Sequence, residues 1–177
     1  MQEHDSKTGA PRRDNKNAHR NGNKGANKGR RAARGYAFQV VYSLGFNPPD
    51  SLEELQAIFS NAKTIKDASL IDGEAAPEQA RPEGFAWDIV HGVWSRREQL
   101  DQLISEFSEG WKVERLGRVE LTVLRMAVYE LKFNEDVPEK VIISEALELA
   151  KQYADQKALA FINGILDSAA KSVRKTA

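Results

Sequence analysis

The stretch RVELTVLRMAVYELKF, residues 118–133, decides the fold of this chain. Its apolar residues surround a helix almost completely, because they stand at positions 119, 121, 123, 124, 126, 127, 128, 131 and 133. A helix that is apolar on nearly all sides is covered by other elements of the fold. We therefore expect residues 118–133 to form the central helix of a helical domain.

Helical periodicity continues on both sides of this segment. Downstream, Pro138 suits the first turn of a helix whose buried stripe runs from Ile142 to Tyr153, and Asp155 can cap a last helix. Upstream, residues 82–108 predict one helix, and residues 113–116 predict one further turn. Each of these segments keeps its apolar residues at a spacing of three or four.

The amino-terminal half adds two more helices. Residues 30–46 carry an apolar stripe that ends before Pro48 and Pro49. Ser51 and Glu54 have the spacing of a capping box, in which each side chain accepts a hydrogen bond from a backbone N–H at the start of a helix. About seven helices and no convincing strand predict an all-α fold.

The formal charge of the 177 residues is zero, but the charge is unevenly distributed. Residues 1–35 carry ten Lys/Arg against three Asp/Glu, which leaves the rest of the chain acidic. Residues 1–29 contain almost no large apolar side chain, so we expect a disordered basic arm before a domain at 30–177. Residues 63–84 read as a long loop insertion. The arm suits a nucleic-acid partner, although a solubilising tail is the alternative.

Composition argues against several classes of protein. The chain has no cysteine, and His91 is the only histidine beyond the arm, so we expect no metal site, cofactor or catalytic triad. The carboxylates fall mostly on polar helix faces, without a glycine-rich phosphate loop. No apolar run approaches the length that spans a bilayer. We expect a cytoplasmic protein without catalytic activity.

Several ordered motifs carry a family resemblance. They are RRAARGYAFQVVY at 30–42, GRVELTVLRMAVYEL at 117–131, DVPEKV at 136–141, SEALELAK at 144–151 and FINGILD at 161–167. Together they resemble the NusB family of transcription antitermination factors over residues 30–60 and 83–174. The resemblance implies two packed three-helix bundles that act without catalysis. It also implies pairing with NusE, a small-subunit ribosomal protein, and binding of single-stranded boxA-type RNA, so that RNA polymerase resists termination on ribosomal RNA operons.

Three arginines are candidates for RNA contact. Arg30 and Arg34 are four residues apart and share a helical face, with Arg31 about 100° away. A guanidinium can reach phosphate with its donors and can stack its plane on an unpaired base. The alternative is a solvated face with local carboxylate partners. The match to the family's arginine-rich segment favours RNA.

The resemblance adds three further candidates. Tyr42 stands at an aromatic position that lies at or beneath the RNA-facing surface in relatives, although its place in the apolar stripe favours core packing over direct stacking. Phe161 matches an aromatic residue associated with that surface. Glu120 matches a position at the NusE interface. Its alternative partners are the internal arginines Arg118 and Arg125. Arg125 and Glu130 look like internal scaffold charges.

Two other functions remain open from the sequence. Some ribosomal RNA methyltransferases carry a NusB-like module that targets RNA, so the chain could be such a domain. It could also be a protein-interaction bundle without an RNA role. The sequence leaves open whether the free protein forms a homodimer.

Overall fold

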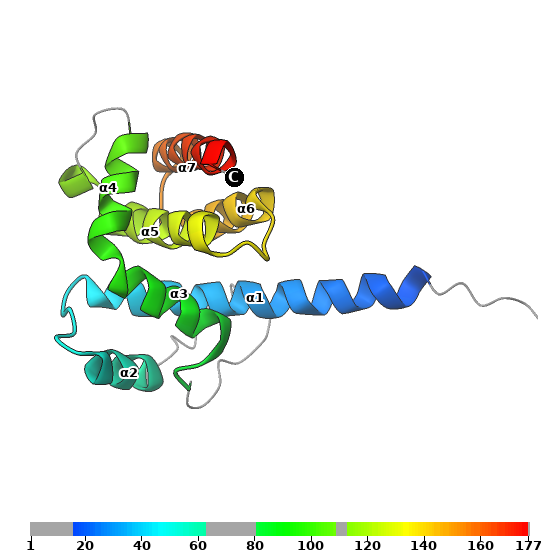
Figure 1. Ribbon diagram of the computed structural model, residues 1–177, viewed down its shortest axis with the longest axis horizontal. Helices are drawn as coiled ribbons and strands as arrows, with labels where there is room; N and C mark the ends of the chain where they lie inside the picture. The colour runs from blue at the N-terminus through cyan, green and yellow to red at the C-terminus, as the bar shows by residue number, and fades with distance from the viewer. Residues whose placement is uncertain (1–15, 63–80, 109–112, 177) are drawn as a thin grey trace, which may run out of the picture.

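The computed structural model describes residues 16–62, 81–108 and 113–176. Within these ranges the chain forms seven α-helices, one short 3-10 helix and no strand, which confirms the all-α prediction (Figure 1). The helices are α1 (Lys16–Leu44), α2 (Leu52–Asn61), α3 (Gly84–Ser95), α4 (Arg97–Phe107), α5 (Arg118–Phe133), α6 (Glu139–Ala150) and α7 (Gln156–Thr176), and the 3-10 helix is Val113–Arg115.

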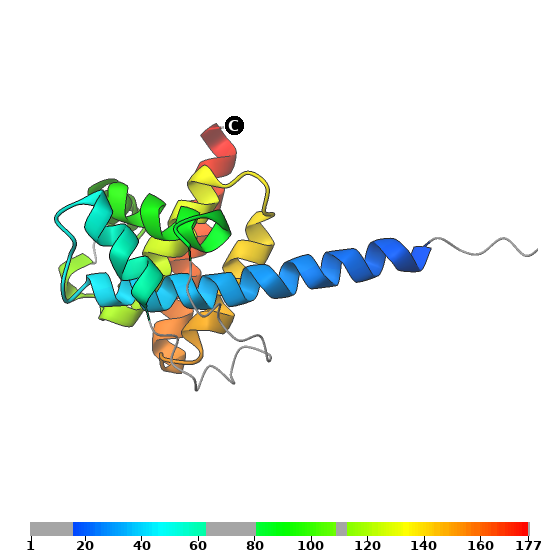
Figure 2. The same cartoon turned by 90° about the horizontal axis from the view of Figure 1, so that it is seen from below.

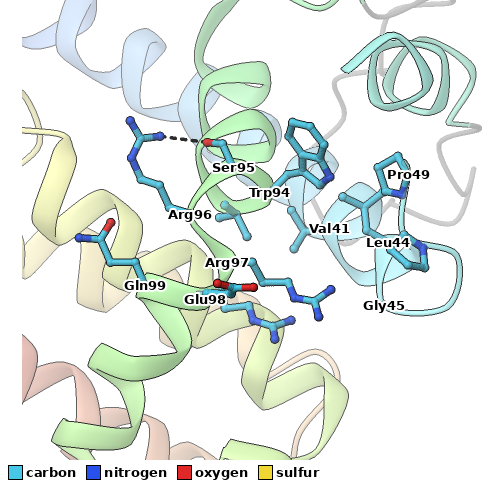
Figure 3. Close-up of a pocket in the computed structure, with 13 residues that line it drawn as sticks. Val41, Leu44, Gly45, Pro49, Trp94, Ser95, Arg96, Arg97, Glu98 and Gln99 are labelled. Atoms are coloured by element: carbon cyan, nitrogen blue, oxygen red, sulfur yellow. Dashed lines mark hydrogen bonds between the residues drawn. The ribbon is translucent and has the colours of Figure 1, made fainter. Parts of the chain in front are cut away.

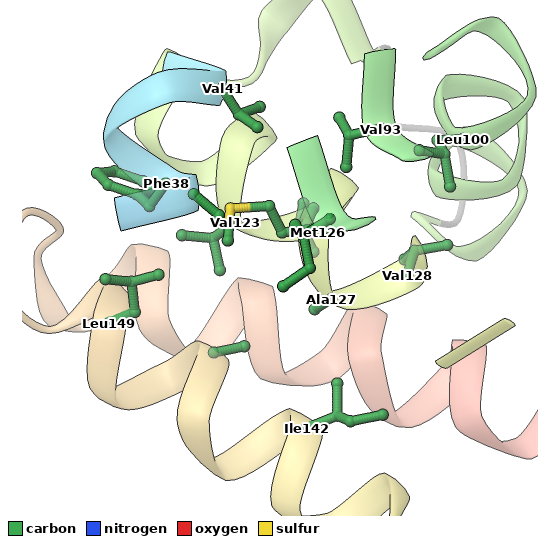
Figure 4. Packing of buried hydrophobic residues seen from close by; sticks show 14 of the residues in the cluster. Phe38, Val41, Val93, Leu100, Val123, Met126, Ala127, Val128, Ile142 and Leu149 are labelled. Atoms are coloured by element: carbon green, nitrogen blue, oxygen red, sulfur yellow. The ribbon is translucent and has the colours of Figure 1, made fainter. Parts of the chain in front are cut away.

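The helices form two packed groups, and α5 of the second group packs against the first. Helices α1, α2 and α3 lie on one side and α4 to α7 on the other (Figure 1). Helix α5 packs against α1, α3, α4, α6 and α7, as its nearly continuous apolar surface predicts. Figure 4 shows α1, α3, α5 and α6 each contributing side chains to this core, among them Phe38, Val93, Met126 and Ile142. No helix in the described ranges could cross a membrane.

Two of the predicted helix caps are present. The Ser51 hydroxyl accepts a hydrogen bond from the Glu54 N–H at 3.2 Å. The Glu54 carboxylate in turn accepts one from the N–H of Asp50 at 2.9 Å. At the start of α7, Asp155 Oδ1 accepts a hydrogen bond from the Ala158 N–H at 2.8 Å. These side chains satisfy backbone donors that lack partners within the helix.

The prediction of a single helix over residues 82–108 is wrong, because the chain breaks at Arg96. That residue has φ −121° and ψ 19°, outside helical geometry, and α4 begins immediately after it. Helix α3 packs against α1 and α5, whereas α4 packs against α5 and α7. The break lets α4 turn toward α7. Within α3, Gly92 lies so close to the Tyr129 ring that a Cβ would overlap it.

Helix α1 begins well before the predicted start at Arg30. Its first residue is Lys16, so residues 16–29 belong to α1 and the predicted start of the helix at Arg30 is corrected. Once its carboxyl-terminal half is packed, extending a helix costs far less than nucleating one. The extension projects beyond the bundle (Figure 2). Residues 1–15 of the predicted arm, and residues 63–80 of the predicted loop insertion, lie outside the described residues.

Candidate RNA and partner interface

The three arginines expected to form one exposed cluster lie in three different environments. Arg34 is buried, Arg31 is exposed and Arg30 is half-buried. Arg30 and Arg34 both lie near Phe85 of α3, whereas Arg31 contacts α6. The prediction of three surface guanidiniums is therefore wrong for Arg34.

Arg34 belongs to the interior of the domain. Its Nη2 donates to Glu130 Oε2 at 2.7 Å, and its Nε donates to Glu130 Oε1 at 2.9 Å. The two side chains are 5% and 2% exposed. Because this pair is enclosed, the Arg34 guanidinium would have to abandon a buried carboxylate to reach a phosphate. The prediction that Glu130 is an internal scaffold charge is confirmed.

Arg31 lies at the surface and is held by α6. Its Nε donates to Glu145 Oε2 at 2.9 Å, and its Nη2 donates to Glu145 Oε1 at 2.6 Å. The Arg31 side chain is 51% exposed, whereas that of Glu145 is only 15% exposed. The hydrogen bond from Arg31 lowers the pKa of Glu145. The pair therefore stabilises the fold above the ordinary glutamate pKa of 4.5, and this contribution is lost as pH falls through the lowered value.

Arg30 is held by an aromatic ring. Its guanidinium carbon lies 5.4 Å from the centroid of Phe85, at the start of α3. The Arg34 guanidinium lies 5.0 Å from the same centroid, within the range of cation–π attraction. Helix α3 thus contacts Arg30, and helix α6 contacts Arg31.

Tyr42 lines an apolar hollow of about 730 Å³ between the second half of α1, the end of α2 and the start of α5. The Tyr42 ring stacks on Phe38 at 5.9 Å and meets the edge of Phe46 at 5.5 Å. On the other side of Phe38, Tyr153 stacks at 4.9 Å. Four aromatic rings therefore follow one another along the hollow.

Two of those rings are open to solvent. Phe46 is 56% exposed, and Tyr153 is 48% exposed, so Tyr153 does not belong to the buried stripe that the sequence predicted. Tyr153 follows the end of α6 in a turn, which carries it off the helical face. Large exposed aromatic residues beside an apolar hollow are typical of protein interaction sites.

Glu120 lies in the first turn of α5, beside the hollow-lining Val119. It is half-buried, and its carboxylate lies against Gly117. Neither internal arginine pairs with it: Arg125 binds Asp101 at 2.7 Å, and the Arg118 guanidinium lies 4.0 Å from the Phe46 centroid. In the described ranges Glu120 has no ion pair, which leaves its charge available to a basic partner.

Phe161 stands on α7 next to the fully buried Ile162. It is half-buried and packs against the core with part of its ring, so it is less exposed than an outward-facing aromatic would be. Arg125, in contrast, is confirmed as an internal scaffold charge by its bidentate pair with Asp101.

A second hollow, of about 760 Å³, lies where the end of α1 faces the break between α3 and α4. Figure 3 shows Trp94, Leu44 and Pro49 on one side of it, with Arg97 and Glu98 below. Arg96 points away from them toward Ser95. No candidate residue from the sequence lies in this hollow. Among the described residues no group of three His, Cys, Asp or Glu side chains could hold a metal ion.

The sequence did not predict two contacts at this interface. Arg31 pairs with Glu145, which stands 114 positions away, so no local pattern indicates this contact. Nothing in the local sequence indicates that Phe85 contacts two arginines. Both contacts depend on how α1 sits between α3 and α6.

Comparison with known proteins identifies the family. The model of the NusB family matches residues 31–171, which is most of the chain. The chain belongs to the NusB family. A transcription antitermination protein NusB of Nitratidesulfovibrio vulgaris is 46% identical over 144 residues, covering 81% of this chain and 89% of the relative. The corresponding protein of Desulfovibrio desulfuricans is 49% identical over 144 residues, covering 81% and 85%.

Solved structures agree with this assignment. NusB of T. maritima is 32% identical and superposes with a TM-score of 0.61, covering 80% of this chain and 90% of that one. A structure of the antitermination factors NusB and NusE in complex with dsRNA includes a chain that is 27% identical, with a TM-score of 0.60 and coverage of 81% and 96%. The two-bundle fold implied by the resemblance is therefore confirmed.

Proposed function

We propose that this protein is a transcription antitermination factor that binds single-stranded boxA-type RNA together with NusE. In this role it keeps RNA polymerase processive on ribosomal RNA operons. Family membership supports the proposal, and a solved relative described as NusB and NusE in complex with dsRNA supports RNA and NusE as partners. The observation that carries it is the cationic edge of α1, where Arg30 and Arg31 are fixed by α3 and α6.

The RNA surface is assigned to Arg30, Arg31 and Phe161, whereas Tyr42 lines the hollow that is assigned to NusE below. Arg34 leaves this set, because its guanidinium is enclosed with Glu130. Arginine at a helix surface suits single-stranded RNA, since the side chain combines charge with a plane that stacks on bases. The basic composition of residues 1–35 adds attraction that does not depend on RNA sequence.

The NusE surface is assigned to Glu120 and the hollow beside it. A half-buried carboxylate without an ion pair in the described ranges attracts a basic side chain, and the exposed ring of Phe46 offers apolar area nearby. A protein-interaction bundle without an RNA role would use the same hollow, but it would not need the fixed arginines. The relatives above are named antitermination proteins, which gives the methyltransferase alternative no support.

The RNA assignment is tested by Arg30→Ala combined with Arg31→Ala. We expect the double variant to bind boxA-type RNA at least about a hundredfold more weakly, because it loses two charged contacts of roughly 1.5–3 kcal/mol each. Affinity is measured by fluorescence anisotropy with labelled RNA at several salt concentrations. Arg96→Ala with Arg97→Ala is the matched control, since it removes the same charge beside the second hollow. Equal losses in both double variants would contradict the assigned surface.

The partner assignment is tested by Glu120→Gln. We expect NusE to strengthen RNA binding by the unmodified protein. We also expect Glu120→Gln to weaken NusE binding about 10- to 150-fold, the cost of one charged pair. Calorimetric titration with purified NusE measures this effect directly. Glu53→Gln, on the exposed face of α2, is the control. If NusE binds Glu120→Gln and the unmodified protein equally well, the carboxylate has no part in docking.

A further inference from the structure

The second hollow, between the end of α1 and the break between α3 and α4, is lined by an excess of positive charge. Among the described residues that line it, three are arginines and one, Glu98, is acidic. The chain around it has the opposite balance, since residues 36–177 carry 16 Lys/Arg against 23 Asp/Glu. The second hollow is therefore a positive patch on an acidic domain, and it favours an acidic ligand.

The floor of the second hollow is apolar. It is formed by buried residues of α1, of the turn after it and of α3, which are Val41, Leu44, Pro49 and Val93. The half-buried Trp94 lines one side (Figure 3). Other lining residues, among them Gly45 and Arg97, are exposed, so the hollow is open to solvent. An open hollow suits a side chain that projects from a larger partner, because a small molecule is usually enclosed over most of its surface.

The three arginines of the second hollow differ in what they already bind. Arg125 forms its bidentate pair with Asp101, so its charge is compensated within the protein. The Arg96 guanidinium lies 4.9 Å from the centroid of the Phe133 ring, away from the hollow. Arg97 is exposed and has no ion pair in the described ranges. Arg97 is therefore the lining cation that can pair with a ligand.

The stability of α4 does not account for Arg97. It is the first residue of that helix, where the helix dipole disfavours a positive charge. The preceding residue, Arg96, makes no capping hydrogen bond with its side chain. Residues that oppose a local rule without a compensating contact are expected at functional sites. We therefore explain Arg97 by a ligand rather than by folding.

We propose that the second hollow docks an acidic segment of a partner protein, whose apolar side chain enters the hollow while a neighbouring carboxylate binds Arg97. The donors of a guanidinium match a carboxylate in a bidentate pair, and a hollow with an apolar floor accepts an anchoring side chain. RNA fits this surface less well, because a phosphate backbone is bound by several cations. In the described ranges, Arg97 is the one arginine of the hollow whose charge is not already engaged.

The second hollow is separate from the surfaces assigned to RNA and NusE. It shares no lining residue with the hollow beside Glu120. Along α1, Leu44 stands fourteen residues after Arg30, which places it roughly 21 Å farther along the helix axis. An acidic partner can therefore bind here without displacing either ligand, and this inference goes beyond the function proposed above.

The experiment uses the full chain and a set of short, fluorescently labelled peptides in which one Leu, Ile, Phe or Trp is flanked by Asp or Glu. Fluorescence anisotropy measures affinity, and NMR spectra of the isotope-labelled protein show where the peptides bind. We expect peptides of this set to bind and to shift the amide signals of Trp94 and Arg97. Replacing the apolar residue by Ala, or the acidic residues by Lys, is expected to weaken binding at least about tenfold.

Two substitutions at Arg97 test the protein side of the contact. We expect Arg97→Ala to weaken peptide binding about tenfold, through loss of one charged contact, and Arg97→Glu to weaken it further by repulsion. A glutamate suits the first turn of α4, so a loss of binding in Arg97→Glu is not a loss of folding. Arg115→Glu is the matched control, because Arg115 is exposed and does not line the hollow. We expect RNA affinity to be the same in both Glu variants.

Several results overturn the proposal. They are no binding by any peptide of the set, equal affinity in Arg97→Glu and Arg115→Glu, and signal shifts confined to the hollow beside Glu120. RNA affinity that falls in Arg97→Glu, without peptide binding, assigns the second hollow to RNA instead. Self-association of the unmodified protein that Arg97→Glu abolishes, measured by sedimentation, assigns it to a second copy of the chain. None of these results bears on the variants of Arg30, Arg31 and Glu120, which test the proposed function separately.

Discussion

Replacing Glu130 by alanine is expected to destabilise the protein by about 3–5 kcal/mol. Glu130 is 2% exposed and binds Arg34, which is enclosed in the same interface between α5 and α1. Without the carboxylate, a guanidinium remains buried with no counter-charge, and its desolvation is no longer offset. The free energy of unfolding is measured by urea denaturation with far-UV circular dichroism, provided that the m-value is unchanged.

Two further variants show whether the effect belongs to the buried pair. Arg34→Met combined with Glu130→Leu removes both charges, and we expect it to recover most of the lost stability, because apolar replacements of similar size tolerate burial. Glu148→Ala removes an exposed carboxylate and should cost less than about 1 kcal/mol. A cost of Glu130→Ala as small as that of Glu148→Ala would contradict the role assigned to the pair.

Replacing Phe59 by alanine is expected to have a comparable effect, about 3–5 kcal/mol, through loss of apolar contacts. Phe59 is 1% exposed and joins α2 to two other helices. Its ring meets the edge of Tyr36 at 5.1 Å and of Trp87 at 5.2 Å, and its carbonyl accepts a hydrogen bond from the Tyr36 hydroxyl. Urea denaturation measures the loss in the free energy of unfolding, and hydrogen exchange shows which helices are destabilised.

We expect the amides of α2 to exchange much faster in Phe59→Ala, while those of α5 follow global unfolding. The control is Leu52→Ala on the same helix, because Leu52 is 38% exposed and should cost less than about 1 kcal/mol. If Phe59→Ala were no more destabilising than Leu52→Ala, α2 would have to be held by contacts other than this ring.

The sequence predicted those elements whose signals are local. The bounds of α5 follow from its own residues, since an apolar segment lies between Gly117 and Asn134. The Ser51 cap is equally local, because its partner Glu54 is three residues away. Such features depend on short-range geometry that a pattern of residue types records directly.

The features that the sequence did not predict depend on distant contacts. The apolar periodicity of residues 82–108 runs through Arg96, and no glycine or proline lies within three residues of it, so the break there reflects where α5 and α7 lie. Burial of Arg34 was unexpected because arginine is rarely enclosed unless it is paired, and its partner stands 96 positions away. The candidate RNA residues were recognised by family resemblance, but the resemblance did not separate the enclosed arginine from the two at the surface.

Helix α1 carries both assigned surfaces, and this arrangement constrains its length. Arg31 and Tyr42 are eleven residues apart, which is close to three full turns, so they lie on nearly the same side of the helix at a separation of about 16 Å. One inserted residue between them would rotate one site by about 100° relative to the other, so one of the two would lose its present neighbours. Changes in the length of α1 therefore keep both sites on the same side of the helix only when they add or remove whole turns. Such changes come in steps of about seven residues. Steps of three or four residues also come close, but they leave the two sites less well aligned.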